Sequence, residues 1–399
     1  MSRQHAGVLF GGILFLVVAM GISRFAFTPI LPFMRDDEGF SLEVGGWLAS
    51  SNYIGYFVGA LGAGFIYKKK KNFLMANVLI NVISIIVMGL THSFVLWILL
   101  RFIAGATGGF IFVLTSSIIM DYLATHLLTR WSGFLFSGIG LGIAISGLVV
   151  PFLESFVSWQ GTWIGLGALS ALFLCTTLFL WRRITVQDGE KIEKSGDTNI
   201  WKGFMPWLIL AYGLEGLGYI ITGTFLVDII YNIEGLRAYA GYSWVVAGLA
   251  AVPSAPIWVT LMTKLSPIKA MSIAYILQVI GIVLPVFSQT AWGVFLSAFL
   301  FGMTFVGLVT MSTGYARQLF PNQSGTIVSI LTTFYALGQI VGPILASKFE
   351  AHFNSFKAPL LFAGAIVALA LVILVVGKWW SDQRQVAEDI IREKERARV

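Results

Sequence analysis

The chain has 399 residues, of which 57% are hydrophobic and 11% are charged. This balance excludes a soluble globular protein, in which about a quarter of the residues are charged, and indicates a polytopic membrane protein whose first partner is the lipid bilayer. The formal net charge of +7 requires no nucleic-acid partner, because basic residues in cytoplasmic loops produce the same excess. We therefore expect no nucleic acid among its partners.

The apolar runs fall into two sets, separated by a polar stretch. At about 20 residues per spanning helix, the first set predicts spans near residues 7–33, 42–66, 72–91, 94–122, 131–154 and 159–181. Charged and turn residues dominate 182–202, which we interpret as a solvated linker. The second set predicts spans near residues 203–230, 240–263, 268–287, 290–316, 325–347 and 357–380. We expect residues 381–399, where acidic and basic side chains alternate, to form a short helix outside the membrane.

These runs predict an all-α integral membrane protein with about twelve transmembrane helices. Residues 1–181 would form an N-terminal six-helix bundle and residues 203–380 a C-terminal one, with 182–202 as a cytoplasmic linker and 381–399 as a cytoplasmic tail. The basic residues that favour this orientation collect on one side, at Lys68 to Lys71, Arg130, Arg182, Arg183, Lys191, Lys194, Lys264, Lys269 and Arg317. By the positive-inside rule both termini lie in the cytoplasm, and the chain is expected in the cell membrane, plasma or inner.

The second half of the chain repeats features of the first at an offset of about 192 to 197 residues. Ser-Arg-Phe-Ala-Phe at 23–27 aligns with Glu-Gly-Leu-Gly-Tyr at 215–219, Gly105 with Gly302, and Glu154 with Glu350. A constant offset near half the chain predicts two pseudo-symmetric halves.

Glycine and proline mark where the spans should pack closely or bend. Gly105, Gly108 and Gly109 permit close approach of helix backbones in the fourth span. Pro253 and Pro256 remove backbone hydrogen bonds and predict a kink in the eighth span.

Three residues of formal charge lie deep within spans: Arg24 in the first, Arg101 in the fourth and Glu215 in the seventh. A charge at the bilayer centre costs at least about 3 kcal/mol on insertion scales and is by default a functional-site hypothesis. Arg24 must therefore be compensated by a carboxylate, a water-filled cavity or an anionic ligand.

Four stretches carry a resemblance to a known family: 21–32 in the first span, 49–55 in the second, 212–226 in the seventh and 338–343 in the eleventh. With the two six-helix halves, they resemble the major facilitator superfamily, and more closely its YbfB/YjiJ group. The resemblance implies the major facilitator fold, alternating access, a monomer, and a central cavity lined by spans one, four, seven and ten. All three deep charges fall on those cavity spans.

Two general superfamily motifs are partly present. Arg101 and Gly105 match the Arg-x-x-x-Gly pattern of the fourth span. The loop after the second span keeps glycines and a basic run, but Tyr67 stands where the superfamily usually has Asp. The fifth span lacks the Gly-Pro pair of the antiporter motif, so the sequence does not predict antiport.

Glu215 and Arg24 have two possible relationships. Burial favours a protonated carboxyl group and a nearby cation favours an ionised one, so Glu215 could load and release a proton while Arg24 acts as its counter-charge or captures a carboxylate or sulfonate. Alternatively, the two form a fixed ion pair that ties the halves together.

Other polar or aromatic residues are candidates for substrate binding or coupling: Asn52, Tyr53, Phe27, Tyr219, Thr304, Tyr335 and Gln339. Hydrogen bonds between helices explain polar residues of this kind at least as often. Arg101 could take part in coupling, or it could bind backbone carbonyls. Asp121 and Asp228 lie at span ends, where solvated or helix-anchoring roles are commoner.

The favoured function is secondary active transport of a small organic solute, coupled to protons. The alternatives are proton-driven efflux of hydrophobic compounds or a non-transporting membrane sensor or scaffold. An enzyme is not expected, because the histidines are scattered singly and no Walker sequence occurs. We expect no cofactor and no metal site; Cys175 is the only cysteine.

Overall fold

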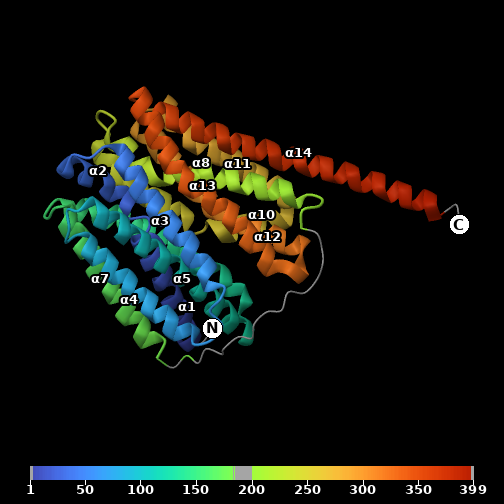
Figure 1. Cartoon of the computed structure of the whole chain (residues 1–399), viewed down its shortest axis with the longest axis horizontal. Coiled ribbons are helices and arrows are strands. Elements are labelled where there is room, and N and C mark those ends of the chain that lie inside the picture. The colour runs from blue at the N-terminus through green and yellow to red at the C-terminus, as the bar shows by residue number, and fades with distance from the viewer. Residues whose placement is uncertain (1–2, 183, 185–199, 397–399) are drawn as a thin grey trace.

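A computed structural model describes residues 3–182, 184 and 200–396, and this part of the chain is built from helices (Figure 1). Most of the predicted linker, residues 183 and 185–199, lies outside the described residues.

The first half contains six helical segments that pass from one end of the molecule to the other. The first segment is broken into α1 (Arg3–Leu16), the π-helix η1 (Val17–Ile22) and α2 (Phe27–Glu38). The others are α3 (Leu42–Ala63), α4 (Lys70–Met88), α5 (Phe94–Thr125), η2 (Thr129–Phe136) with α6 (Ser137–Glu154), and α7 (Trp159–Leu180).

The second half follows the same plan. It comprises α8 (Met205–Tyr231), η3 (Arg237–Tyr239) with α9 (Ala240–Ala251) and α10 (Ser254–Leu265), α11 (Pro267–Phe287), α12 (Ala291–Leu319), η4 (Pro321–Gln323) with α13 (Ser324–Phe353), and α14 (Lys357–Arg396). The segment containing α9 and α10 bends by 44° at its break, which confirms the kink predicted from Pro253.

Among the described residues, 10 helices are long and apolar enough to cross a membrane, or 11 if the bent pair α9 and α10 is one span. The remaining segment, α3, has 22 residues, which is enough for a span. Ser50, Ser51 and Asn52 follow one another in it and make it less apolar than the others. The fold class is therefore the predicted all-helical membrane protein.

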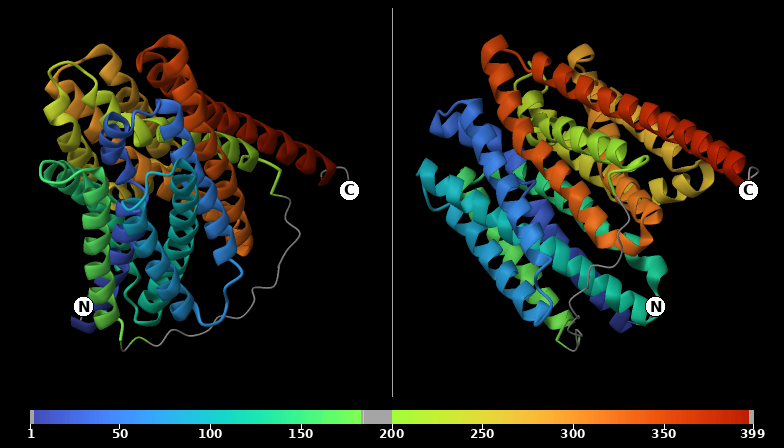
Figure 2. Two further views of the ribbon diagram at one scale, coloured as in Figure 1. Left: turned by 60° about the vertical axis from the view of Figure 1, so that its left-hand side comes forward. Right: turned by 45° about the vertical axis from the view of Figure 1, so that its right-hand side comes forward.

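The tail is helical through Arg396, as predicted, but it is not set off from the last span. Helix α14 runs without a break from Lys357 to Arg396, so the last span continues directly into the charged segment. Figure 2 shows this helix extending past the rest of the bundle.

The molecule has two ends that we name by their connections. The linker face carries the N-terminus and the connections after α3, α5, α7, α10 and α12; the distal face carries the connections after α2, α4, α6, α8, α11 and α13. The halves meet where α2 packs on α8 and α3 on α13 (Figure 1), and where α6 packs on α9.

Glycines let the helices of each half approach closely. A Cβ atom added to Gly105 of α5 would lie 2.0 Å from the carbonyl oxygen of Asn52 in α3. The corresponding Gly302 of α12 would place a Cβ 2.0 Å from the carbonyl oxygen of Ala247 in α9. These paired contacts repeat the same helix packing in both halves, as the sequence repeat predicts.

Candidate functional site

The first span loses its α-helical form at the level of Arg24. Residues 17–22 form a π-helix, with the amide of Ser23 donating to the Val18 carbonyl at 2.8 Å and that of Phe25 to the Met20 carbonyl at 3.1 Å. A turn at 23–26 follows before α2 begins at Phe27. Such a break releases carbonyl groups from the helical ladder, and inside a membrane they need other donors.

Arg101 supplies those donors from α5. Its Nη1 donates to the carbonyl of Ser23 at 2.9 Å and its Nη2 to the carbonyl of Arg24 at 3.4 Å. Its guanidinium carbon lies 4.5 Å from the ring centre of Phe27. Asn81 of α4 adds a hydrogen bond from Nδ2 to the Ser23 hydroxyl at 3.0 Å. Of the two roles left open for Arg101, the structure places it on backbone carbonyls.

Arg24 projects from this turn into a cage of aromatic rings. Its guanidinium carbon lies 4.6 Å from the ring centre of Tyr56, 4.7 Å from that of Tyr53 and 5.2 Å from that of Phe25. The residue is 4% exposed. Its Nε and Nη2 atoms are buried without a hydrogen-bond partner among the residues that the structure describes.

Glu215 lies in the middle of α8 and is 0% exposed. Its Oε1 accepts a hydrogen bond from Nε2 of Gln278 in α11 at 3.0 Å. Its Oε2 is buried and has no partner within the described part of the chain. Burying an ionised carboxylate with a single neutral donor is costly.

The fixed pair of Arg24 and Glu215, one of the two possibilities raised by the sequence, does not form in the structure. The described salt bridges do not join these two residues, and each keeps unpartnered polar atoms. Aromatic side chains of α8, α12 and α13 lie in the same central region instead.

Those aromatic side chains form a series of nearly parallel rings, which we call the aromatic ladder: Tyr212, Tyr335, Tyr219, Phe305 and Phe301. Successive ring centres are 4.3, 5.4, 5.9 and 5.2 Å apart, and successive planes differ by 18°, 19°, 7° and 16°. Phe25 of the Arg24 cage contacts Phe305 edge to face at 6.2 Å. The ladder therefore links the cage to Tyr212, which lies one helical turn from Glu215.

The other candidates divide into two groups. Gln339 donates a hydrogen bond to the Tyr219 hydroxyl, and Tyr53 and Thr224 share one at 2.9 Å, so these side chains belong to the central region. Asn52 donates to the Arg101 carbonyl at 3.0 Å, and Thr304 donates to the Leu300 carbonyl of its own helix at 2.7 Å. Asn52 thus joins α3 to α5, Thr304 bonds within α12, and neither is among the residues that contact the Arg24 guanidinium.

Several members of this region were absent from the sequence prediction: Phe25, Tyr56, Tyr212, Gln278 and Phe301. Helical spacing could have found some of them, because Tyr56 follows Tyr53 by three positions and Tyr212 precedes Glu215 by three. Gln278 carried no such signal, since its helix holds no other candidate residue.

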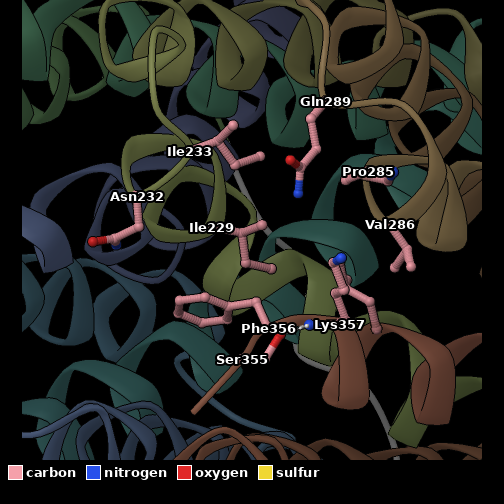
Figure 3. Close-up of a pocket in the computed structure, with 10 residues that line it drawn as sticks. Ile229, Asn232, Ile233, Pro285, Val286, Gln289, Ser355, Phe356 and Lys357 are labelled. Carbon is pink, nitrogen blue, oxygen red and sulfur yellow. Dashed lines mark hydrogen bonds between the residues drawn. The ribbon is translucent and has the colours of Figure 1, made fainter.

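A separate cavity opens at the distal face (Figure 3). It is lined by residues at the ends of α8 and α11 and at the start of α14: Ile229, Asn232, Ile233, Pro285, Val286, Gln289, Ser355, Phe356, Lys357 and Leu360. None of the predicted site residues contributes to its lining, so this cavity is distinct from the central region.

Charged residues also join the halves at the distal face. Arg35 Nη1 of α2 lies 2.6 Å from Asp228 Oδ2 of α8, and the Asp228 side chain is 1% exposed. Asp36 Oδ2 accepts hydrogen bonds from Tyr231 at 2.8 Å and from Arg237 at 3.2 Å. We call these two groups the distal latch. It gives Asp228 the helix-anchoring role expected for a residue at a span end.

The family model described as "Uncharacterised MFS-type transporter YbfB" matches residues 16–375 of the chain. The chain belongs to this family of the major facilitator superfamily. It is therefore a multi-pass membrane transporter, as the resemblance in the first, second, seventh and eleventh spans implied.

Relatives of this major facilitator protein include transporters and resistance proteins. It is 24% identical to the uncharacterized MFS-type transporter YceJ of Bacillus subtilis, over 92% of this chain and 94% of the relative. It is 24% identical to the multidrug resistance protein MdtG of Klebsiella pneumoniae, over 75% of this chain and 74% of the relative. It is 21% identical to the quinolone resistance protein NorA of Staphylococcus aureus, over 93% and 96%.

Solved structures share the fold. A crystal structure of the nucleoside transporter NupG superposes with a TM-score of 0.75 at 14% identity, covering 94% of this chain and 100% of that one. This likeness places the YbfB-family chain in the same all-helical architecture and carries no information on its substrate.

Proposed function

We propose that this YbfB-family transporter moves a small organic solute by alternating access and couples the movement to protons through Glu215. The observation that carries the proposal is the carboxyl group of Glu215, which is fully buried in α8 with one neutral donor and no cation in a described salt bridge. A carboxyl group in this setting favours its neutral form and would release its proton when a conformational change brings water or a cation to it.

Arg24 supports the same proposal from the first half. It is a permanent cation in the same central region, and it lies in the neighbourhood of the aromatic ladder that leads toward Glu215. Solute binding at the cage and proton release at Glu215 would thus occur on facing helices of the two halves. The protein would act as a monomer, since one chain supplies every group that the proposal uses.

We propose further that the linker face is cytoplasmic and that the protein resides in the cell membrane. The excess of lysine and arginine in the connections at 64–69, 126–130 and 264–269 supports this orientation. Proton entry from the distal face and release at the linker face would then follow the usual direction of a proton gradient.

A second candidate is proton-driven efflux of hydrophobic compounds. It is favoured by the printed names of MdtG and NorA, a multidrug and a quinolone resistance protein. Efflux and uptake differ in direction, and everted membrane vesicles separate them. Solute accumulation inside everted vesicles when the lumen is acidified would indicate efflux, and solute release would indicate uptake.

The coupling is tested in liposomes that contain the purified protein and a pH-sensitive dye, with a mixed panel of organic anions and hydrophobic cations. The wild type should move protons when an effective solute is added. Glu215→Gln keeps the size of the side chain and should abolish proton movement. Glu350→Gln, which changes a carboxyl group near the distal end of α13, is the matched control and should retain it.

Two results would count against the proposal. Unchanged proton movement in Glu215→Gln would show that another group carries the proton. Solute exchange by the wild type with no accompanying pH change would show that transport is not coupled to protons at all.

A further inference from the structure

The unpartnered atoms of Arg24 lie on one edge of its guanidinium group. Nε and Nη2 point their N–H bonds in the same direction, and this edge matches the two oxygens of a carboxylate or sulfonate. Buried donors without a partner are rare and costly, so a group that satisfies both is expected at some stage of the transport cycle. The described side chains do not supply that acceptor.

The surroundings of Arg24 offer contacts to a flat apolar body. Tyr53, Tyr56 and Phe25 enclose the guanidinium, and the aromatic ladder begins beside them at Phe305. Arg24, Tyr56 and Phe305 keep 4%, 9% and 5% of their surface exposed, whereas Glu215 keeps 0%. The remaining accessible surface of the central region thus lies on the cage and on ladder rings, including Tyr335 at 7%, and not on the carboxyl group.

The charges of the region favour an anion. Among the described residues deep inside the spans, Arg24 and Arg101 are cations and Glu215 is the carboxyl group. Arg101 donates from Nη1 and Nη2 to the carbonyls of Ser23 and Arg24, and Asp228 is paired with Arg35 at the distal face. The region therefore has an excess of positive charge, which grows when Glu215 takes up a proton.

From these observations we infer that the transported solute is an aromatic organic anion. Its carboxylate or sulfonate binds the Nε and Nη2 edge of Arg24, and its ring stacks against Phe305, the ladder ring beside the cage. This inference rests on the proposed transport function and adds the substrate class to it. Ring stacking contributes apolar contact area. The paired N–H donors of Arg24 at Nε and Nη2 favour solutes with a planar anionic group.

Binding to the purified full-length protein, measured by calorimetry, tests the inference without requiring transport. The probes share a ring or a charge: naphthoate, naphthalenesulfonate, naphthamide, naphthylmethylammonium and cyclohexanecarboxylate. The wild type should bind naphthoate at least about tenfold more tightly than naphthamide or the ammonium compound, because a charged pair of hydrogen bonds contributes more than one factor of ten.

Three variants assign the contacts. Arg24→Met should weaken naphthoate binding at least about tenfold, and Arg24→Lys, which keeps the charge and loses the fork, should weaken it less. Phe305→Leu should weaken naphthoate more than cyclohexanecarboxylate, because only naphthoate loses ring stacking. Unchanged elution and melting temperature of the variants show that they are folded.

Tighter binding of the ammonium compound than of naphthoate would overturn the inference, and so would naphthoate binding that survives Arg24→Met. Failure of every aromatic carboxylate and sulfonate to bind at millimolar concentration would also overturn it.

Glu215→Gln separates the two proposals. If it binds naphthoate but moves no protons, both hold; if it binds naphthoate and still moves protons, only the coupling fails. Proton movement that depends on Glu215 but is driven only by cationic solutes would overturn the inferred substrate class. It would leave the proposed coupling through Glu215 intact.

Discussion

Two buried arginines of the same half have opposite surroundings. Arg101 donates to two carbonyl oxygens of the broken first span, whereas two donors of Arg24 remain without a described partner. The Nε of Arg101 is also buried without a described partner, but its two Nη atoms hold these carbonyls in place. The unpartnered Nε and Nη2 of Arg24 cost free energy that a ligand accepting from them can recover. Arg101 thus fixes the shape of the broken span, and the binding role proposed for Arg24 uses its unpartnered donors.

This difference predicts unequal effects of the same substitution on stability. Arg101→Met should lower the free energy of unfolding by about 1–3 kcal/mol, because two buried carbonyls lose their donors. Arg24→Met should change it by less than about 1 kcal/mol, because only contacts with aromatic rings are lost. Thermal unfolding of both variants in one detergent measures the contrast. Equal destabilisation by the two substitutions would contradict it.

At the same scale, the sequence identifies charges better than it identifies their neighbours. Arg24, Arg101 and Glu215 could be singled out because charged residues are rare within spans. Phe25 and Tyr56 could not, because the chain has 32 phenylalanines and 12 tyrosines and most aromatic side chains only fill the bundle or face lipid. The cage is defined by which rings meet in space.

Close packing of α3 on α5 fixes the position of the cage residues of α3 relative to Arg101 of α5. Gly105 lies against the Asn52 carbonyl, and Gly109 lies against Tyr56, where an added Cβ would approach the backbone oxygen to 2.5 Å. Asn52 precedes Tyr53, so any shift of α3 along α5 would also move a ring of the cage. The glycines therefore position aromatic side chains that they do not touch.

Gly105→Ala should consequently lower the free energy of unfolding by about 1–3 kcal/mol through overpacking. Gly314→Ala in α12 is the matched control, since a Cβ at Gly314 meets nothing within 4 Å. It should be neutral or stabilise the helix by up to about 1 kcal/mol. Melting temperatures of the two variants check the prediction, and a stable Gly105→Ala protein would show that α3 can move away at little cost.

The elements themselves were predictable to different degrees. The span predicted at 268–287 is the helix Pro267–Phe287, and the kink at Pro253 appears as expected, because bilayer thickness and proline act locally. The π-helix at Val17–Ile22 was not predicted. The turn after it exposes the carbonyls of Ser23 and Arg24, which accept from Arg101. Arg101 lies 77 residues from Arg24 along the chain, so no local sequence pattern predicts this break.

At the scale of the whole molecule, the described hydrogen bonds between the halves gather on the distal side of Arg24. They join Thr28 to Gly223, Ser50 to Ile340, Tyr53 to Thr224, Arg35 to Asp228, and Asp36 to Tyr231 and Arg237. An alternating-access cycle requires these bonds to break when the distal face opens. The distal latch thus contributes to the free-energy difference between the two states.

Asp228→Asn should therefore raise the population of the distally open state. Removing one partner of a mostly buried ion pair costs about 1–3 kcal/mol, which changes a two-state ratio by roughly tenfold or more. Spin labels on cysteines at positions 38 and 236, in a Cys175→Ser background, report the separation of the halves by pulsed electron resonance. Asp37→Asn changes an exposed neighbour and should leave the distance distribution as in the parent protein. An unaltered distribution in Asp228→Asn would show that the latch does not contribute to the free energy of distal opening.

The concentration of these bonds at one end also determines how motion is distributed over the molecule. A rigid half that pivots about its bonded end displaces each atom in proportion to its distance from the pivot. Residues beside Thr28 and Gly223 would move little, while the far ends of α5 and α12 would sweep the widest arc. Arg24 and Glu215 lie close to the pivot. A large displacement at the linker face would therefore change the distance between these two residues only slightly.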